Sequence, residues 1–485
     1  MITTLAQRIE SRTPADRDRA VDGLRALALL GVVAGHWMVG ALVLTGGGLV
    51  VDSPLRALPA LGPASWVLQM LGLFFLVGGR VAAQGWASAR SRGRRYVSWL
   101  WRRVARLCRP VLAVLVAWTF AVPALLGLGV SGQTVRSAVT LVLQPLWFVA
   151  VYLVLTALTR LVMAADQRFG LLALVPGPVI VAVVDALRYG PWSDQVPGWI
   201  QWLNLLPGWL FGYQLGVAWA AGRFAGRRPW LLLGVGVAAF TTLVTVAGYP
   251  LSMVGVPGSG RTNAHPPSLL VLALAAVQSG VALLVHRRLS RTLHRPRLWA
   301  AVVVVNLAAM SILCWHQTAA LVPAMVADSR GLVLPGLTDA PTGAAWLATR
   351  AAWLPLLLAL LVGFCWAARR WESGDARLAP TRTARRHPGA GPLPSDAAVH
   401  DCQGLAPQSS RGNLRKRRPG PLLGADARLV LPVLRGPYRG TDGGMGVHQR
   451  GRPHPGRGAD GLGQDAVGVP LGAGCPGHHT CAGRA

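Results

Sequence analysis

The chain has 485 residues, of which 52% are hydrophobic and only 14% charged, and its mean hydropathy is +0.43. Soluble domains carry about 25% charged residues, so this composition excludes an ordinary soluble protein. The formal net charge of +30 does not indicate nucleic-acid binding, because the arginines of the first 370 residues are interleaved between apolar runs. That arrangement is typical of loops that face anionic lipid.

Ten apolar runs follow one another along the chain, each long enough to cross a hydrocarbon core of about 30 Å as a helix. We therefore expect an all-α polytopic membrane protein. The transmembrane helices are predicted at about 24–45, 64–84, 110–130, 138–160, 170–187, 198–220, 230–249, 268–286, 298–324 and 343–368. Residues 1–23 form the expected N-terminal segment, and residues 24–370 form the membrane domain.

The arginines alternate between successive loops. The loops after the second, fourth, sixth and eighth predicted spans hold 18 arginines, and the most basic of them is 90–109. The loops after the odd-numbered spans hold one arginine each, namely Arg56, Arg136, Arg188, Arg261 and Arg330. Because positively charged loops stay in the cytoplasm, this alternation predicts ten spans with both termini cytoplasmic.

The composition changes after Arg370. Residues 371–485 contain 22 Gly and 13 Pro, which predicts a disordered cytoplasmic tail rich in Gly, Pro and Arg. An out-of-frame reading of the end of the gene is the alternative, since GC-rich frames also read as these residue types. Two Cys and two His lie close together near the end of the tail, at positions 475–481. We interpret this spacing as chance and expect no metal site.

Ionisable side chains inside membrane spans are costly and therefore indicate function. His36 lies in the first predicted span, 11 residues after Arg25. At about 100° per residue this spacing brings both side chains to one face of the helix, with His36 deeper in the membrane. Histidine suits proton transfer at neutral pH, so His36 is a candidate general base. The alternative is a buried polar residue that bonds a neighbouring helix.

The first predicted span, from Asp22-Gly23-Leu24-Arg25 to Gly35-His36-Trp37, resembles the opening of the membrane acyltransferase-3 family, which is marked by an arginine and a histidine separated by ten residues. Stretches similar to later landmarks follow in family order: Phe74-Phe75-Leu76-Val77-Gly78-Gly79, Arg103 with Arg106 and Pro110, Leu146-Trp147-Phe148 through Tyr152, Thr262-Asn263 with Pro266-Pro267, and Leu313-Cys314-Trp315-His316. The resemblance covers about residues 17–370. Arg80 after the paired glycines and Cys314 before Trp-His depart from the pattern and could alter the pocket.

The resemblance implies an integral membrane O-acyltransferase in the cytoplasmic (inner) membrane of a bacterium. Such an enzyme moves an acetyl or other short acyl group from acyl-CoA, with acetyl-CoA the expected donor, to a hydroxyl of a carbohydrate or lipid-linked acceptor. His36 is then the catalytic base, and Arg25 is the second catalytic residue, which helps to bind or orient the donor. Guanidinium groups form forked bonds with phosphate, so Arg25, Arg103 and Arg106 are expected to bind the donor. For the arginines, lipid anchoring and positive-inside topology are the alternatives.

Three further residues are assigned to the acceptor. His316 lies toward the outer half of the ninth predicted span, Trp147 is in the fourth, and Asn263 precedes the Pro266-Pro267 turn. A role in the interfacial aromatic belt, packing and turn formation, respectively, are the alternatives. A secondary transporter or exporter, with His36 coupling protons, is the rival function, although the two halves of the chain show no matching pair of interrupted helices. A non-catalytic relative that binds a lipid-linked glycan is the second rival.

Overall fold

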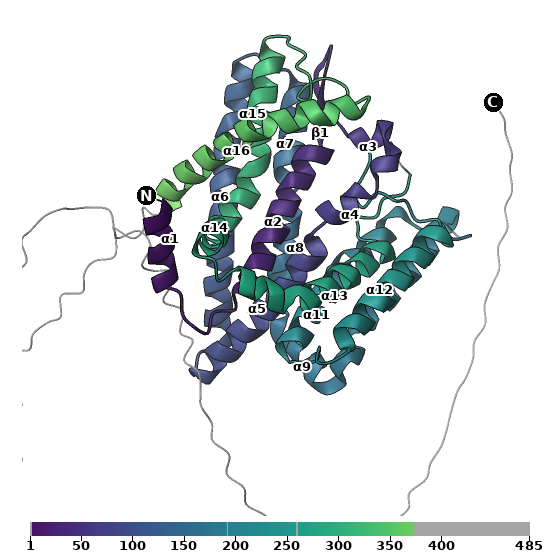
Figure 1. The fold of residues 1–485 in the computed structure, drawn as a ribbon. Helices are drawn as coiled ribbons and strands as arrows, with labels where there is room; N and C mark the ends of the chain where they lie inside the picture. The colour runs from purple at the N-terminus through teal and green to yellow at the C-terminus, as the bar shows by residue number, and fades with distance from the viewer. Residues whose placement is uncertain (1, 192, 259, 373–485) are drawn as a thin grey trace, which may run out of the picture. The chain divides into compact units, whose positions relative to one another are not determined.

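The computed structural model describes residues 2–372 except 192 and 259, so the predicted tail lies outside the described residues beyond position 372 (Figure 1). The first half of the described chain contains α1 (Ile2–Ser11), α2 (Arg19–Val39), β1 (Ala41–Thr45), β2 (Gly48–Asp52), α3 (Pro54–Ala57), η1 (Pro59–Leu61), α4 (Ala64–Leu68), α5 (Leu71–Ser91), α6 (Tyr96–Gly127), α7 (Gly132–Leu143), α8 (Leu146–Ala157) and α9 (Thr159–Phe169). The second half contains η2 (Gly170–Leu174), α10 (Pro176–Tyr189), η3 (Ser193–Gln195), η4 (Gly198–Asn204), α11 (Leu205–Ala220), α12 (Arg228–Thr245), α13 (Leu269–Thr292), α14 (Pro296–Leu307), α15 (Ala309–Ser329) and α16 (Ala344–Glu372).

Eight helical segments among the described residues are long and apolar enough to cross a membrane. A ninth is added if the pair Thr159–Leu174 and Pro176–Tyr189, bent by 48°, counts as one span. The predicted span 198–220 corresponds to η4 and α11, and α11 has only 16 residues. A span needs about 20 residues, which is why this segment falls short as a single straight helix.

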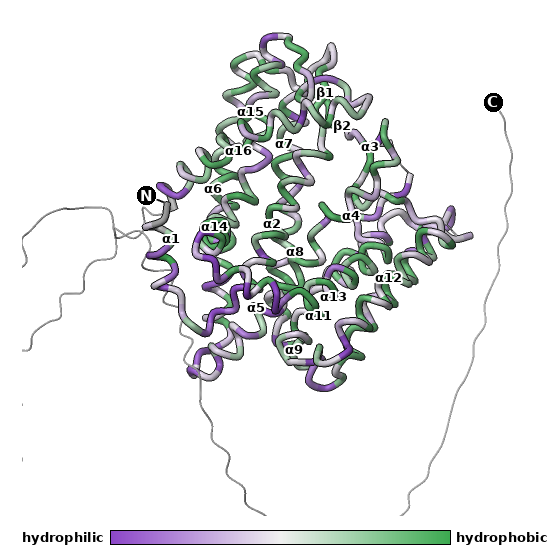
Figure 2. The backbone as a smooth tube through the Cα atoms, viewed as in Figure 1, coloured by the Kyte–Doolittle hydropathy of each residue, from purple (hydrophilic) through white to green (hydrophobic). Residues whose placement is uncertain are grey.

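Large apolar side chains also lie on the outside of the helices. Phe120 is 72% exposed and Val235 is 68% exposed, as expected for helices that face hydrocarbon rather than water. Figure 2 shows that hydrophobic residues run along the middle of the helices, whereas hydrophilic residues gather at the ends of α5, α9 and α12. The multi-pass membrane architecture is therefore confirmed.

The expectation of an all-α protein is wrong at the end of the first span. The predicted helix 24–45 ends at Val39, and residues 41–52 form an antiparallel hairpin in which Ala41 pairs with Asp52 and Thr45 with Gly48. Gly48 has a φ of 117°, which favours glycine and permits the tight turn. Leu and Val are apolar in a strand as in a helix, so hydropathy alone does not separate the two.

The third span begins earlier than predicted. Helix α6 starts at Tyr96, and Pro110, the predicted first residue of that span, lies inside it. Half of residues 96–109 are Arg, Leu or Ala, which favour helix, so this stretch extends the helix on the N-terminal side of the apolar part. Arg103 and Arg106 consequently lie on a helix and not in the predicted loop 90–109.

Helix α2 lies among the other long helices of the described domain and contacts α4, α5, α13, α14, α15 and α16 (Figure 1). Glycines let the helices α5 and α11 pack closely against each other. A Cβ atom on Gly216 would collide with the backbone of Leu76, and one on Gly79 would collide with the backbone of Tyr213. Small residues let membrane helices approach in this way. The helix that carries Arg25 and His36 is thus surrounded by a tightly packed scaffold.

Candidate active site

Two histidines from distant parts of the chain form the centre of the site. His36 lies near the end of α2 and His316 lies inside α15, and Nδ1 of His36 is 2.6 Å from Nε2 of His316. The rings are stacked, with an interplanar angle of 11° and centroids 4.9 Å apart. The His316 residue is fully buried. The structure therefore joins the predicted base directly to a residue that the sequence assigned to the acceptor.

The hydrogen-bond partners fix the tautomers of this pair when both rings are neutral. Nδ1 of His316 lies 2.8 Å from the carbonyl oxygen of Leu313, and because a carbonyl only accepts, Nδ1 must carry the hydrogen. Nε2 of His316 is then an acceptor, and His36 donates to it from Nδ1. This leaves Nε2 of His36 without a proton. A relay of two oriented histidines thus presents a basic nitrogen, the arrangement that general-base catalysis requires.

His36 lies on the wall of a cavity of about 520 Å³. Trp147, His265, Gln317 and Arg350 supply other parts of the wall. The rest is mainly apolar and includes Val32, Leu71, Leu141, Phe148 and Val254. A largely apolar cavity with a few polar groups is the usual form of a small-molecule site.

Trp147 and His265 meet edge to face at the cavity, with ring centroids 5.0 Å apart. Trp147 therefore lines the cavity, and its role in acceptor binding stays a prediction. His265 was missed by the sequence analysis, although it stands between two of the quoted landmarks, Asn263 and the proline pair. Burial lowers the pKa of the His265 imidazole, which keeps the ring neutral near pH 7.

Asn263 does not line the cavity. Its Nδ2 donates to the carbonyl oxygens of Pro250 (2.7 Å) and Ser252 (2.8 Å), and its Oδ1 accepts from the Ser268 hydroxyl (2.7 Å). The buried amide thus holds together the segment between α12 and α13. These bonds fit the turn-forming alternative for Asn263. Its role toward substrate stays a prediction.

Arg25, Arg103 and Arg106 form a second cluster, away from the cavity wall. The charges of Arg25 and Arg103 both act on Arg106, so the three residues predicted to bind the donor do lie near one another. Arg103 also stands over the Trp99 ring, 4.9 Å from its centroid. Within the described part of the chain, none of the three forms an ion pair with an acidic group. Eleven residues of helix place His36 about 16 Å along the axis from Arg25.

Arg350 is a cavity residue that the sequence analysis did not single out. It belongs to α16 and is only 4% exposed. Its Nε donates to the carbonyl oxygen of Trp37 (2.7 Å), next to His36 in the chain, and its Nη1 donates to that of Gly336 (3.3 Å). The available signal was an arginine inside the predicted span 343–368, where charge is costly.

Arg80, which follows Gly78-Gly79 and departs from the family pattern, has local contacts that explain its charge. Its Nη2 lies 2.9 Å from Oδ2 of Asp18, and its guanidinium stands 3.9 Å from the centroid of the Trp219 ring. Asp18 also caps α2 and contacts Nε2 of His286 at 3.0 Å. Burial raises the pKa of Asp18, but the His286 hydrogen bond and the neighbouring positive charges outweigh it, so the pKa is lowered overall. This ion-pair cluster at the start of α2 stands apart from the cavity.

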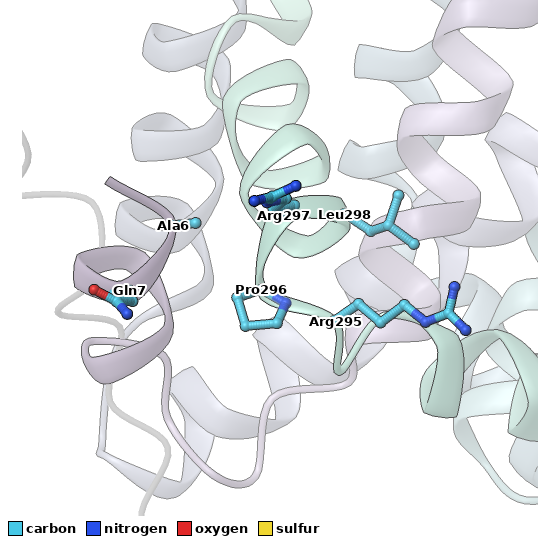
Figure 3. A pocket seen from close by; sticks show the side chains of 6 residues that line it. All are labelled: Ala6, Gln7, Arg295, Pro296, Arg297 and Leu298. Atoms are coloured by element: carbon cyan, nitrogen blue, oxygen red, sulfur yellow. The ribbon is translucent and has the colours of Figure 1, made fainter. Parts of the chain in front are cut away.

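A second cavity, of about 440 Å³, lies between α1 and the beginning of α14 and is lined by Ala6, Gln7 and residues 295–298 (Figure 3). The Arg295 guanidinium extends away from α1, and no histidine, cysteine or carboxylate contributes to the wall. In residues 2–372, apart from the two gaps, no three His, Cys, Asp or Glu side chains could hold a metal ion. The Cys/His group at 475–481 lies outside the described residues.

Comparison with known proteins identifies the family of the chain. A family model described as an acyltransferase domain, that of acyltransferase-3, matches residues 18–370. No curated protein and no solved structure shows significant similarity to the chain. The matched region includes both histidines, the arginine cluster and the cavity. The chain is therefore a multi-pass membrane protein of the acyltransferase-3 family.

Proposed function

We propose that the protein transfers an acetyl or other short acyl group from acyl-CoA to a hydroxyl group of a carbohydrate or lipid-linked acceptor, with His36 as the general base. The observation that carries this proposal is the contact between His36, which lines the cavity, and the buried His316 behind it. His316 orients the His36 ring, so that the free Nε2 is available to an acceptor hydroxyl.

The reaction is a proton-assisted acyl transfer. Nε2 of His36 takes the proton of the acceptor hydroxyl while its oxygen attacks the thioester carbonyl. Collapse of the tetrahedral intermediate breaks the carbon–sulfur bond, and the departing CoA sulfur takes the proton from the His36 imidazolium. While His36 is charged, its bond to His316 becomes charge-assisted and therefore stronger, which stabilises the intermediate stage.

The arginine cluster supports acyl-CoA as the donor. These three guanidinium groups form no ion pair with an acidic group of the described residues, so they suit the phosphates of CoA. The long pantetheine arm suits their separation from His36. We propose that this cluster faces the cytoplasm, where acyl-CoA is made. We base this orientation on ten spans with both termini cytoplasmic in a bacterial inner membrane. The bent pair α9–α10 is then the fifth crossing, and η4 with α11 is the sixth.

An acyl-CoA assay with a matched histidine control tests the proposal. Purified protein in nanodiscs is supplied with acetyl-, propionyl- or succinyl-CoA and a glycan acceptor, and release of free CoA is measured. We expect His36→Ala to lower the rate by about 10²–10⁴, the usual contribution of a general base. His294→Ala, at an exposed position outside the site, should leave the rate unchanged. No CoA release by the parent protein with any of the donors would refute the proposal.

Transport is the less well supported function. A proton-coupled transporter needs an intramembrane carboxylate or histidine that is free to exchange its proton. Asp185 lies in α10, but Asn204 (2.9 Å), Tyr249 (2.9 Å) and the backbone nitrogen of Leu269 (2.8 Å) all donate to it. These three bonds tie the carboxylate into the fold and leave the histidine pair as the reactive group.

A further inference from the structure

Arg350 is a buried cation without an acidic partner among the described residues, and the centroid of the Trp346 ring lies 5.8 Å from its guanidinium. The residue is 4% exposed, and no ion pair joins it to an acidic residue in the part of the chain that the structure describes. Buried charges in proteins are normally paired, and arginines inside membrane spans are rare and costly. A positive charge retained at this position therefore calls for an anionic partner that the described residues do not supply.

The hydrogen bonds of Arg350 use only part of its donors. Nε donates to Trp37 and Nη1 to Gly336, both at carbonyl oxygens, whereas Nη2 donates to no described residue. Two carbonyl oxygens could be satisfied by a neutral donor such as glutamine, so holding the end of α2 does not by itself require an arginine. The remaining donors and the charge belong to a residue that lines the cavity with His36.

Asp52 is the carboxylate on the same cavity wall, and it does not cancel this charge. Its Oδ1 accepts from the backbone nitrogen of Ser53 (2.8 Å), its side chain is partly exposed, and no ion pair connects it to Arg350. The cavity thus carries a buried cation and a separate, partly exposed anion. A bound group with a negative charge would complete the hydrogen bonds of the guanidinium, most strongly if it is a planar carboxylate or a phosphate.

We propose that Arg350 forms an anion subsite beside His36, and that one substrate of the proposed acyl transfer presents a carboxylate or phosphate to it. This inference rests on the proposed function and specifies its substrate class. The charged group belongs either to the acceptor, as in an acidic or phosphate-linked glycan, or to the acyl group, as in a dicarboxylic acyl-CoA. Arg350 is then the residue that determines specificity for charge.

Pairs of related substrates, one member with a carboxylate and the other without, test the subsite. Methyl β-D-glucuronide and methyl β-D-glucoside serve as acceptors, and succinyl-CoA and acetyl-CoA as donors, with kcat/KM measured for each combination. We expect the parent to favour the anionic member of one pair at least tenfold, Arg350→Gln to abolish that preference, and Arg350→Lys to retain most of it. If Arg350→Gln loses the preference for the anionic acceptor, the charged group belongs to the acceptor. If it loses the preference for the anionic donor, the charged group belongs to the acyl group. Equal slowing of all four combinations by Arg350→Gln would overturn the subsite and leave a purely structural role.

A binding measurement separates the subsite from the acyl transfer. Thermal unfolding of the protein in nanodiscs is followed with each glycoside and with succinate, acetate or inorganic phosphate, in the parent, His36→Ala and Arg350→Gln. Stabilisation by an anionic probe in the first two proteins but not in Arg350→Gln supports the subsite even if no CoA is released. If the parent releases CoA normally but shows no preference for charged substrates, in turnover or in binding, the subsite is refuted while the proposed acyl transfer stands. If the glutamine variant does not fold, the parent and Arg350→Lys still distinguish these two outcomes.

Discussion

The Nδ1 atom of His36 lies 2.6 Å from Nε2 of His316, although 280 residues separate the two in the chain. The bond orients a basic nitrogen because the backbone of α15 fixes the tautomer of the second ring. In this arrangement the two histidines have unequal roles. In the proposed reaction, His36 contacts the reacting hydroxyl, and His316 positions His36.

Substitution of His316 tests this inequality. We expect His316→Ala to lower kcat because the His36 ring loses its orientation and tautomer, but by less than His36→Ala, since the base itself remains. His316→Gln, which can still accept a hydrogen bond from His36, should recover part of the loss. Single-turnover release of CoA measures the chemical step. Equal rates in the alanine and glutamine variants would show that the bond to His36 does not matter.

The arginine cluster should affect donor binding more than chemistry. Replacing Arg25, Arg103 or Arg106 by glutamine removes a charge that acts on the donor phosphates, so KM for acyl-CoA should rise while kcat changes less. The effect should shrink as salt is added, since salt screens charge at exposed sites. Arg136→Gln, at an exposed position on another helix, is the matched control. A rise in KM of the same size in that control would show that net charge alone explains the effect.

Burial of His265 should make stability depend on pH. The lowered pKa keeps His265 neutral in the folded protein, whereas the unfolded chain takes up a proton as the pH falls through 6.5. The contribution of His265 to the free energy of unfolding is therefore fully present above pH 6.5. It is lost toward lower pH, by at most about 1.4 kcal/mol per pH unit. Thermal unfolding of the parent and His265→Gln at pH 7.5 and 5.5 isolates the effect, which should be smaller in the variant. Identical pH dependence in both proteins would exclude this role.

The contact between α5 and α11 provides a test of the packing. A Cβ on Gly216 would meet the backbone of Leu76 and Arg80, so Gly216→Ala should cost about 1–3 kcal/mol of stability through overpacking. Gly234 is also inside a helix but has open space around it, so Gly234→Ala should be neutral or stabilising by up to about 1 kcal/mol. The difference between their unfolding temperatures measures the contact. Equal effects would mean that the two helices are not packed as closely as described.

The membrane architecture was predictable because each apolar run is long and is separated from the next by charge or by glycine and proline. The ends of the spans were less predictable. Leu42 and Val43 are as apolar in a hairpin as in a helix, and Tyr96 begins a helix whose first turns are basic and therefore outside any hydropathy window. Hydropathy measures transfer to lipid, and secondary structure at a span's end depends on the turn that follows.

The candidate site was partly predictable for a related reason. Periodicity gave the depth of His36 along its helix, but it contains no information about which other helix faces it, so the contact with His316 required the tertiary structure. Arg350 was missed because one charge does not interrupt a long apolar run, and its partner atoms are backbone carbonyl oxygens that no sequence pattern marks. His265 lies in a segment without periodicity, where only the fold brings it to Trp147.

The bond from Arg350 to the carbonyl oxygen of Trp37 joins residues 313 positions apart and connects the last described helix to the first membrane-spanning one. During synthesis α2 leaves the ribosome long before α15 and α16 exist. The nascent chain therefore has His36 in place without its positioning histidine and without the arginine that holds the end of its helix. The proposed acyl transfer therefore starts only when translation of the whole domain is complete, and an interrupted chain has no finished site at which to consume a donor.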